Sequence, residues 1–266
     1  MTTKDGKTSR DLSGEVDRIE QMINSPEVRD MRKKTLTHSG YIRPRNASTM
    51  ILLDGPKDDP KILMGKRNKN LKFMPGALVF PGGSVDPGDG SVPSTDELTE
   101  TTRNRLIASM RGRPTPRGAR ALAMAAIREV AEESGLLIGK PGDFNHAHEH
   151  WADFREAGIV PSLSGLRLFS GAITPPGMPR RFDTWFFLAH KSEVGFVPEG
   201  GFAPDGELEG LQWIRPEEAI VQNTRDITRV MLVELINRLK ADVDLFDGYP
   251  APYYFTRGSK FRRTQI

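Results

Sequence analysis

The stretch of sequence that decides the fold is REVAEESGL, residues 128–136. It lies within a strongly helical segment, 120–137, whose alanine and aliphatic side chains give a narrow packing face. The glycine at position 135 is typical of the residue that follows the last helical turn, because glycine adopts the left-handed conformation without strain. The segment therefore predicts a helix that ends at Gly135.

Three glutamates of this stretch fall on one face of the predicted helix. Glu129, Glu132 and Glu133 stand at positions i, i+3 and i+4, where like charges repel one another. A hard cation such as Mg²⁺ or Mn²⁺ takes oxygen ligands and would neutralise the cluster. Arg128 is placed to orient a carboxylate through paired hydrogen bonds. Because an acidic helix face taken alone is more often a solvated surface, the neighbouring sequence has to decide between the two interpretations.

A glycine turn upstream supplies that context. In PGGSVDPGD, residues 81–89, five residues separate Gly83 from Asp89. Together with residues 128–136, this turn resembles the Nudix box, G-x5-E-x7-R-E-U-x-E-E-x-G-U, in which U is a bulky aliphatic residue. Two departures stand out. Asp89 replaces the first glutamate of the pattern, and 38 residues rather than seven separate it from Arg128, so that the box is split by an insertion of 31 residues.

Further stretches resemble the Nudix subgroup of coenzyme A diphosphatases with a split box. They are FMPGALVFPGG at 73–83 and ITPPGMPRRFDTWFFLA at 173–189. Residues 63–83 also keep the spacing of a coenzyme A motif of Nudix proteins, although Lys72 replaces an arginine and so loses the guanidinium fork. The resemblance covers roughly residues 42–240. A basic hairpin edge is the alternative interpretation of the coenzyme A motif.

The resemblance implies an α/β fold, the Nudix α/β/α sandwich with a mixed β-sheet. We expect the Nudix domain at 41–245 with an insertion at 90–119, a polar N-terminal extension at 1–40 and a C-terminal tail at 246–266. The insertion is interpreted either as a lid over the substrate or as surface decoration. The expected strands are 47–54, 61–65, 77–80, 166–174, 184–189 and 208–214, and the expected helices are 96–110, 120–135, 226–240 and a short one from Pro216. The N-terminal extension is interpreted first as a mobile or loosely docked arm, with a short amphipathic helix at 17–34 as the alternative. Residues 140–165 are expected to be irregular.

The resemblance also implies a site and a cofactor. The expected metal ligands for Mg²⁺ or Mn²⁺ are Glu129, Glu132, Glu133 and a backbone carbonyl at Gly83 or Gly82. The expected catalytic residues are Glu132, Glu129, Arg128 and Glu209, with Glu132, Glu207 and Glu209 as alternatives for the general base. The expected substrate-binding residues are Arg67, Lys72, Arg180 and Arg181. Any of these four could equally be surface charge, and Glu207 and Glu209 could be an ordinary exposed strand edge.

Three functions follow from these expectations. The first is hydrolysis of the pyrophosphate bond in coenzyme A or acyl-coenzyme A, which gives adenosine 3′,5′-bisphosphate and a 4′-phosphopantetheine. The second is the same chemistry on ADP-ribose or a dinucleotide. The third is a regulatory module that binds a nucleotide without turnover, and the intact set of three glutamates argues against it. In each case the partner is a nucleotide-type small molecule.

The composition excludes several other classes. The chain of 266 residues has no cysteine, which excludes disulfides and thiolate metal sites. With 38 basic and 35 acidic residues, the formal net charge of +3 is too small to indicate nucleic-acid binding. No apolar run is long enough for a membrane span, and the absence of a signal peptide and of a Ser-Lys-Leu ending leads us to expect a cytoplasmic protein. The histidines at 146, 148 and 150 are expected in a solvated loop rather than a zinc site, and a homodimer is left open.

Overall fold

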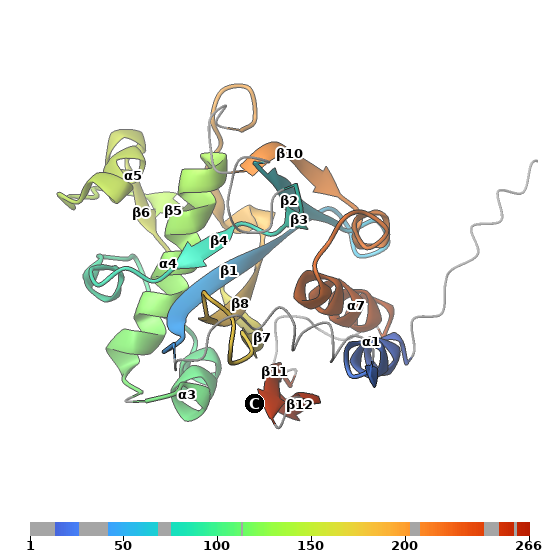
Figure 1. Cartoon of the computed structure of the whole chain (residues 1–266). Helices are drawn as coiled ribbons and strands as arrows, with labels where there is room; N and C mark the ends of the chain where they lie inside the picture. The colour runs from blue at the N-terminus through green and yellow to red at the C-terminus, as the bar shows by residue number, and fades with distance from the viewer. Residues whose placement is uncertain are drawn as a thin grey trace, which may run out of the picture.

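The computed structural model of the chain describes residues 14–26, 42–68, 76–112, 114–202, 208–241, 250–257 and 260–266. A mixed β-sheet forms the centre of the molecule, with helix α4 (Pro116–Ser134) on one face and helix α7 (Asp226–Lys240) on the other (Figure 1). This arrangement is the α/β/α sandwich expected from the sequence. Two of the expected site residues, Lys72 and Glu207, lie outside the described residues.

Nine strands of the described chain make up the main sheet. Seven of them lie in the order β10-β2-β1-β8-β7-β11-β12, while β3 pairs with β2 and β4 pairs with β1. The strands are β1 (Arg45–Asp54), β2 (Lys61–Arg67), β3 (Leu78–Val79), β4 (Gly82–Ser84), β7 (Arg167–Ile173), β8 (Phe182–His190), β10 (Leu208–Ile214), β11 (Pro252–Arg257) and β12 (Lys260–Gln265). The pairs β1–β8 and β7–β11 are parallel and the other pairs are antiparallel, which makes the sheet mixed.

A second sheet of three strands in the order β6-β5-β9 lies beside α4. Its strands are β5 (Leu137–Pro141), β6 (Ile159–Pro161) and β9 (Val194–Phe196). The remaining helices are α1 (Glu15–Ile23), α3 (Glu100–Ser109), α5 (Ala152–Ala157), α6 (Pro216–Ala219) and three 3₁₀ turns, η1 (Asp89–Ser91), η2 (Glu149–Trp151) and η3 (Lys191–Glu193).

Strand β1 shows why the sheet is covered on both faces. Successive side chains of a strand point to opposite faces. Met50 and Leu52 belong to the apolar cluster that contains the α4 side chains, whereas Ile51 and Leu53 belong to the cluster that contains the α7 side chains. A continuous apolar run is therefore required in this strand, and STMILL provides it.

The ends of α4 follow from local sequence signals. The hydroxyl of Thr115 accepts a hydrogen bond from the Gly118 N–H at 3.0 Å, and Pro116 occupies the first helical position, where its missing N–H costs nothing. At the other end, Gly135 has φ of 74°, in the left-handed region. The predicted end of the helix at Gly135 is confirmed.

Two regions differ from the sequence expectation. The segment 140–165, expected to be irregular, contains α5 and β6 and the end of β5. The described part of the expected C-terminal tail forms the hairpin β11–β12, which adds to the edge of the main sheet beside β7. The hairpin is held in place because Tyr254 donates a hydrogen bond to Glu234 of α7 at 2.5 Å and Tyr253 donates one to Asp183 of β8 at 2.6 Å.

Helix α1 lies in the described part of the N-terminal extension and overlaps the start of the helix considered for 17–34; residues 27–34 lie outside the described residues. Its Ile23 is buried, and the helix contacts α7 and β12. Just after it, Asn24 donates a hydrogen bond to the Phe261 carbonyl at 3.1 Å and accepts one from the Phe261 N–H at 2.6 Å. The segment around α1 and the hairpin β11–β12 are therefore in direct contact.

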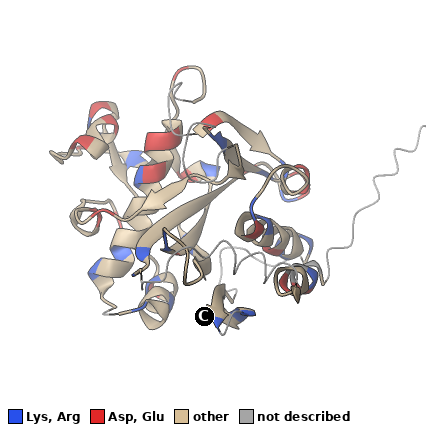
Figure 2. Ribbon diagram, viewed as in Figure 1, with Lys and Arg blue, Asp and Glu red and all other residues tan. Residues whose placement is uncertain are grey.

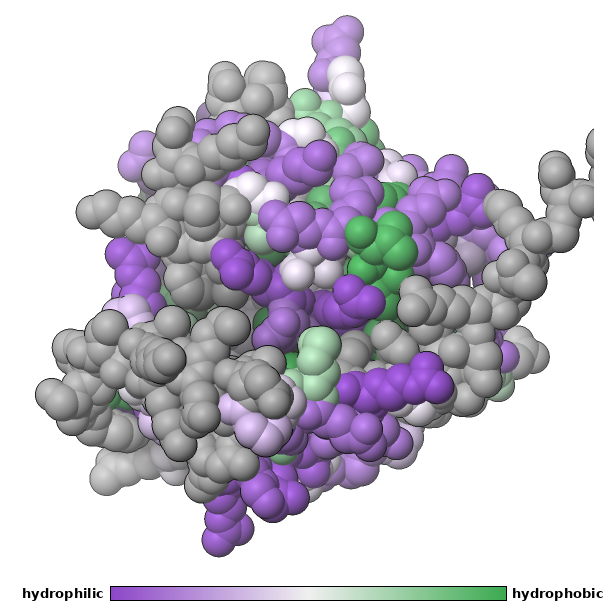
Figure 3. Space-filling view, turned by 45° about the vertical axis from the view of Figure 1, so that its right-hand side comes forward, coloured by the Kyte–Doolittle hydropathy of each residue, from purple (hydrophilic) through white to green (hydrophobic). Residues whose placement is uncertain are grey.

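The described residues visible on one face of the molecule are mostly hydrophilic, with small hydrophobic areas between them (Figure 3). Within the part of the chain that the structure describes, no helix combines the length and the apolar character needed to cross a membrane.

Candidate active site

The glycine turn and the C-terminal half of α4 come together in space despite the insertion between them. Strand β4 pairs with β1 so that Gly83 lies opposite Ser48, and this pairing presses the turn against the helix. The Gly82 N–H donates a hydrogen bond to Glu133 at 2.9 Å. A β-carbon at Gly83 would collide with the carboxylate of Glu129, so a larger residue at this position would have to displace that side chain.

Arg128 connects the two halves of the split box. Its guanidinium, which is 3% exposed, donates hydrogen bonds to Glu129 at 2.9 Å and Glu132 at 3.1 Å on the helix. It also donates to the Ser84 carbonyl at 2.7 Å and to both carboxylate oxygens of Asp89, at 3.1 and 3.2 Å. One buried side chain thus binds the turn, the start of the insertion and two helix carboxylates.

Asp89 has a structural position in this arrangement. Its side chain is 2% exposed and accepts a hydrogen bond from the Asp86 N–H at 2.8 Å in addition to those from Arg128. The aspartate that departs from the family pattern therefore fixes the loop and neutralises Arg128. Its shorter side chain is sufficient because η1 brings the backbone of Asp89 directly against α4.

The electrostatics of the cluster favour a charged guanidinium. Burial lowers the pKa of Arg128, but the hydrogen bond to Asp89 and the charges of Glu129, Asp89 and Glu132 outweigh burial and raise this pKa above its ordinary value. One guanidinium pairs with the carboxylates of Asp86, Asp89, Glu129 and Glu132, and Glu133 adds a fifth carboxylate to the cluster. An excess of negative charge is therefore concentrated at this end of α4, where Figure 2 shows red acidic segments.

His150 is a site residue that the sequence analysis missed. Its Nδ1 lies 2.6 Å from an oxygen of Glu132 and its Nε2 lies 3.8 Å from Asp86, while its ring stacks on His148 with centroids 5.0 Å apart. The histidines were expected in a solvated loop, and two of them are indeed exposed. The spacing H-x-H gave no signal that the η2 turn would place one ring against α4.

The fit of a divalent cation can be judged from the donors. Glu129, Glu132 and Glu133 offer carboxylate oxygens, and the absent side chain of Gly83 leaves the backbone close to Glu129. This all-oxygen set suits a hard cation. In the present conformation the carboxylates point to Arg128, Gly82 and His150, and no three acidic or histidine side chains among the described residues converge as metal ligands. Rotation of the glutamate side chains is needed for all three to bind one ion.

The other predicted site residues lie on β2, on β10 and beside β8. Arg67 is the last residue of β2, and the exposed Glu209 of β10 lies opposite Lys66 of β2. Arg180 is exposed just before β8. Arg181 is 7% exposed and donates hydrogen bonds to the carbonyls of Thr174 and Ile42, which places it at the N-terminal ends of β1 and β8 rather than beside the glutamates.

The insertion packs beside α4 and contributes to the core. Val92, Leu98 and Leu106 are buried in the same apolar cluster as the inner face of α4. Asp96 accepts hydrogen bonds from the backbone N–H groups of Leu163 and Ser164 at 2.6 and 2.9 Å, from the hydroxyls of residues 162 and 164, and from the Lys140 ammonium. Because the insertion is anchored in this way, we interpret it as a fixed part of the fold rather than as a mobile lid.

Comparisons with known proteins agree with this geometry. No family model matches the chain. Nudix hydrolase 7 of Caenorhabditis elegans is 30% identical over 188 residues, which cover 66% of this chain and 53% of the relative. The solved structure of a Nudix hydrolase from Alicyclobacillus acidocaldarius is 25% identical, with a TM-score of 0.54 over 76% of this chain and 93% of the other. The chain belongs to the Nudix hydrolase superfamily.

Another group of relatives within this superfamily carries a more specific name. The acyl-coenzyme A diphosphatase NUDT19 of Xenopus laevis is 28% identical over 211 residues, covering 61% of this chain and 54% of the relative. The human NUDT19 is 25% identical over 239 residues, covering 68% and 60%. The chain thus spans little more than half the length of the curated relatives it matches.

Proposed function

We propose that this Nudix protein hydrolyses the pyrophosphate bond of coenzyme A or acyl-coenzyme A in a reaction that depends on a divalent metal. Water adds to one phosphorus atom and the bridging oxygen leaves with the other. The products are adenosine 3′,5′-bisphosphate and a 4′-phosphopantetheine, which carries the acyl group when one is present.

The observation that carries this proposal is the spatial reassembly of the split box around Arg128. The turn at Gly82–Ser84 and the carboxylates of α4 are brought together by direct hydrogen bonds across more than forty residues of sequence. A split box of this kind, with the coenzyme A-type spacing of residues 63–83, is the feature that resembles the diphosphatase subgroup. Relatives named acyl-coenzyme A diphosphatase NUDT19 support the same substrate class.

The residues of this chain would act chiefly by positioning. Glu129, Glu132 and Glu133 are the groups that would hold Mg²⁺ or Mn²⁺, together with the carbonyl of Gly83. When bound, such an ion neutralises phosphate charge and lowers the pKa of coordinated water. Arg128 holds the helix carboxylates in place.

His150 is suited to orienting Glu132, and Glu132 in turn is suited to accepting a proton from the attacking water. His150 lies against Glu132 at 2.6 Å and thereby restricts the rotation of that carboxylate. Proton transfer from water requires a carboxylate with an unshared oxygen near the reacting phosphate. Glu132 is the most exposed of the three carboxylates, at 31%, so we infer that it becomes the base once one of its contacts with His150 and Arg128 opens; the exposed Glu209 is the alternative outside the box.

Substrate assays test the proposal directly. The protein is incubated with Mg²⁺ or Mn²⁺ and, separately, coenzyme A, acetyl-coenzyme A, ADP-ribose, NADH and a diadenosine polyphosphate, and the products are identified by mass spectrometry. We expect cleavage of the two coenzyme A substrates at the pyrophosphate bond. Cleavage of ADP-ribose or a dinucleotide without cleavage of coenzyme A would contradict the assignment of substrate. Binding of one compound without turnover of any would contradict the assignment of enzyme activity.

A matched pair of variants tests the site. Glu132→Gln is expected to abolish turnover while the unfolding temperature stays near that of the wild type, because the side chain is partly exposed and keeps its size. Glu149→Gln removes the same charge from the neighbouring η2 turn, where the side chain is exposed, and is expected to retain activity. Near-normal turnover by Glu132→Gln would show that the glutamate assignment is wrong.

A further inference from the structure

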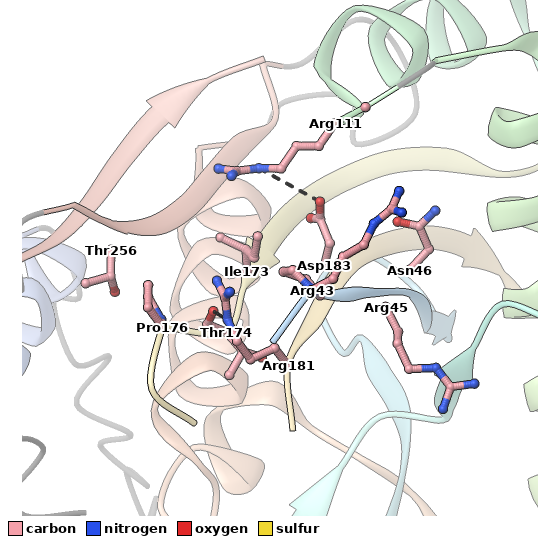
Figure 4. A pocket seen from close by; sticks show the side chains of 12 residues that line it. Arg43, Arg45, Asn46, Arg111, Ile173, Thr174, Pro176, Arg181, Asp183 and Thr256 are labelled. Atoms are coloured by element: carbon pink, nitrogen blue, oxygen red, sulfur yellow. Dashed lines mark hydrogen bonds and ion pairs between the residues drawn. The ribbon is translucent and has the colours of Figure 1, made fainter. Parts of the chain in front are cut away.

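A second concave site lies at the N-terminal ends of β1 and β8, next to the segment that joins α3 to α4. The cavity has a volume of about 740 Å³, within the range of small-molecule sites. Figure 4 shows its lining side chains. Those that the argument uses are Arg43, Arg45, Asn46, Arg111, Arg181 and Asp183. We call this cavity the arginine pocket.

The charges of the arginine pocket are strongly unbalanced. Four guanidinium groups line it against a single carboxylate, that of Asp183. Arg43 and Arg45 form no ion pair within the described part of the chain, and both are exposed. Arg111 is 58% exposed on its side chain and approaches Asp183 only to 3.9 Å. Arg43, Arg45 and Arg111 therefore bring more positive charge to the pocket than the single carboxylate of Asp183 can balance.

Some of these groups are held rigidly. Arg181 is buried and its guanidinium donates to the carbonyls of Thr174 at 3.1 Å and Ile42 at 2.8 Å. Asp183 is 3% exposed and accepts a hydrogen bond from Tyr253 at 2.6 Å, which occupies one of its oxygens. Burial raises the pKa of Asp183, whereas the hydrogen bond from Tyr253 and the charges of Arg111 and Arg181 act in the opposite direction.

A second cavity, lined by both apolar and polar side chains, adjoins the arginine pocket across Arg111. It has a volume of about 580 Å³ and is lined by Ala108, Tyr253, Phe255 and Ile266 among others. Arg111 belongs to both linings, and its guanidinium lies 5.8 Å from the centre of the Tyr253 ring. A ligand that combines an anionic group with an organic group would find a complementary surface for each part.

The arginine pocket is separate from the glutamate cluster. Arg111 precedes the N-cap of α4 at Thr115, whereas Glu129 lies fourteen residues beyond that N-cap. At 1.5 Å per residue, the helix spans about 21 Å between its N-cap and Glu129. The β1 rim of the pocket lies nearer to the cluster, because the Asn46 carbonyl accepts a hydrogen bond from the Val85 N–H and Arg128 binds the adjacent Ser84 carbonyl. Figure 2 shows the same separation, with basic segments toward the lower end of α4 and on α3 and acidic segments at the upper end of α4.

We propose that the arginine pocket binds a phosphate-bearing organic molecule at a site distinct from the Nudix glutamates. Guanidinium groups match phosphate oxygens through paired, charge-assisted hydrogen bonds. Arg43, Arg45 and Arg111 supply mobile donors, Arg181 supplies a fixed one, and the cavity beside Tyr253 takes the organic part. The inference does not depend on the proposed hydrolysis, because it rests on residues outside the split box.

Binding of two probes in EDTA tests the proposal. Without metal, the carboxylates of α4 repel phosphate, so the glutamate cluster does not compete for the ligand. Inorganic pyrophosphate and adenosine 3′,5′-bisphosphate are titrated into the full chain by isothermal titration calorimetry. We expect saturable binding of both, tighter for the bisphosphate and weakened by added salt because the attraction is screened. The proposal would be overturned if neither probe bound saturably.

Variants locate the binding. The double variant Arg43→Gln with Arg111→Gln is expected to raise the dissociation constant of the bisphosphate at least about tenfold, since charge-assisted bonds are lost. Arg225→Gln, at the exposed N-cap of α7, removes a positive charge elsewhere and is expected to have no effect. If the double variant does not fold, Arg45→Gln at the exposed start of β1 provides the same comparison with a smaller loss.

Two further results would contradict the proposal. Equal weakening by Arg225→Gln would show that the anion responds only to the overall charge of the protein. Loss of binding in Glu132→Gln, with retention in the pocket variants, would place the anion at the glutamate cluster. The fluorescence of Trp185 gives an independent readout, because its ring lies 5.5 Å from that of Tyr253. We expect the bisphosphate to change this emission in the wild type and not in Trp185→Phe.

Discussion

Replacement of Arg128 by methionine would remove the group that joins the two halves of the split box. The side chain of methionine has a similar length but no charge, so it leaves Asp89 buried at 2% exposure without its main partner. Breaking a buried ion pair from one side costs about 3–5 kcal/mol. For a domain of this size, each kcal/mol lowers the unfolding temperature by about 2–4 °C. We therefore expect the unfolding temperature to fall by at least about 6 °C, with loss of coenzyme A hydrolysis.

A double-mutant cycle isolates the contact between Arg128 and Asp89. Asp89→Asn removes the buried charge that Arg128→Met leaves without a partner, so the double variant should be more stable than the sum of the two single losses predicts. Coupling between residues in direct contact amounts to about 0.5–3 kcal/mol. Urea unfolding of the wild type, the two single variants and the double variant measures it. Coupling near zero, or an Arg128→Met variant as stable as the wild type, would refute the role assigned to Arg128.

Three further predictions concern the surroundings of the site. Gly83→Ala should lower turnover about 100-fold with little change in substrate binding, because its β-carbon displaces the Glu129 carboxylate; equal turnover in steady-state kinetics would contradict this. The pKa of Asp96 is lowered because hydrogen bonds from Lys140 and from residues 162 and 164 outweigh burial. The stability it contributes is thus complete above its ordinary pKa of 3.8 and is lost as the pH falls below that value, so Asp96→Ala should flatten the acid limb of a plot of unfolding free energy against pH. Gly135→Ala should cost about 1–2 kcal/mol in urea unfolding, because the position has φ of 74°.

The main elements around the site could be predicted from local sequence signals. The apolar run of β1, the hairpin turn before β2 and the glycine after α4 are each encoded within a few residues, and the structure has these elements close to the predicted positions. The grouping of Glu129, Glu132 and Glu133 follows from helical spacing alone. A motif whose residues all lie on one helix can therefore be predicted from the sequence.

Long-range contacts were not accessible in this way. The hairpin β11–β12 was expected as a C-terminal tail, and its place in the sheet depends on pairing with β7 and on the contact of Tyr254 with Glu234. The short strands β5 and β6 lack an extended apolar alternation, and they are stabilised by pairing with each other and with β9.

The contacts of the site residues are also long-range, so they could not be predicted from the sequence. Asp89 looked like a departure from the family pattern, and its value as the partner of Arg128 becomes visible only when η1 is placed against α4. His150 could not be assigned for the same reason, because only the fold brings it to Glu132. Arg181 was grouped with substrate-binding residues by its charge, whereas the structure uses its guanidinium to bind the Thr174 and Ile42 carbonyls at another cavity.

Binding of Mn²⁺ to the α4 carboxylates is the measurement that tests the central claim most directly. Electron paramagnetic resonance follows the free ion as it is titrated into the protein. The wild type is expected to bind Mn²⁺ saturably. The combined variant Glu129→Gln, Glu132→Gln and Glu133→Gln is expected to lose both this binding and coenzyme A hydrolysis. Unchanged Mn²⁺ binding in the combined variant, or coenzyme A hydrolysis by the wild type that persists in EDTA, would contradict the account.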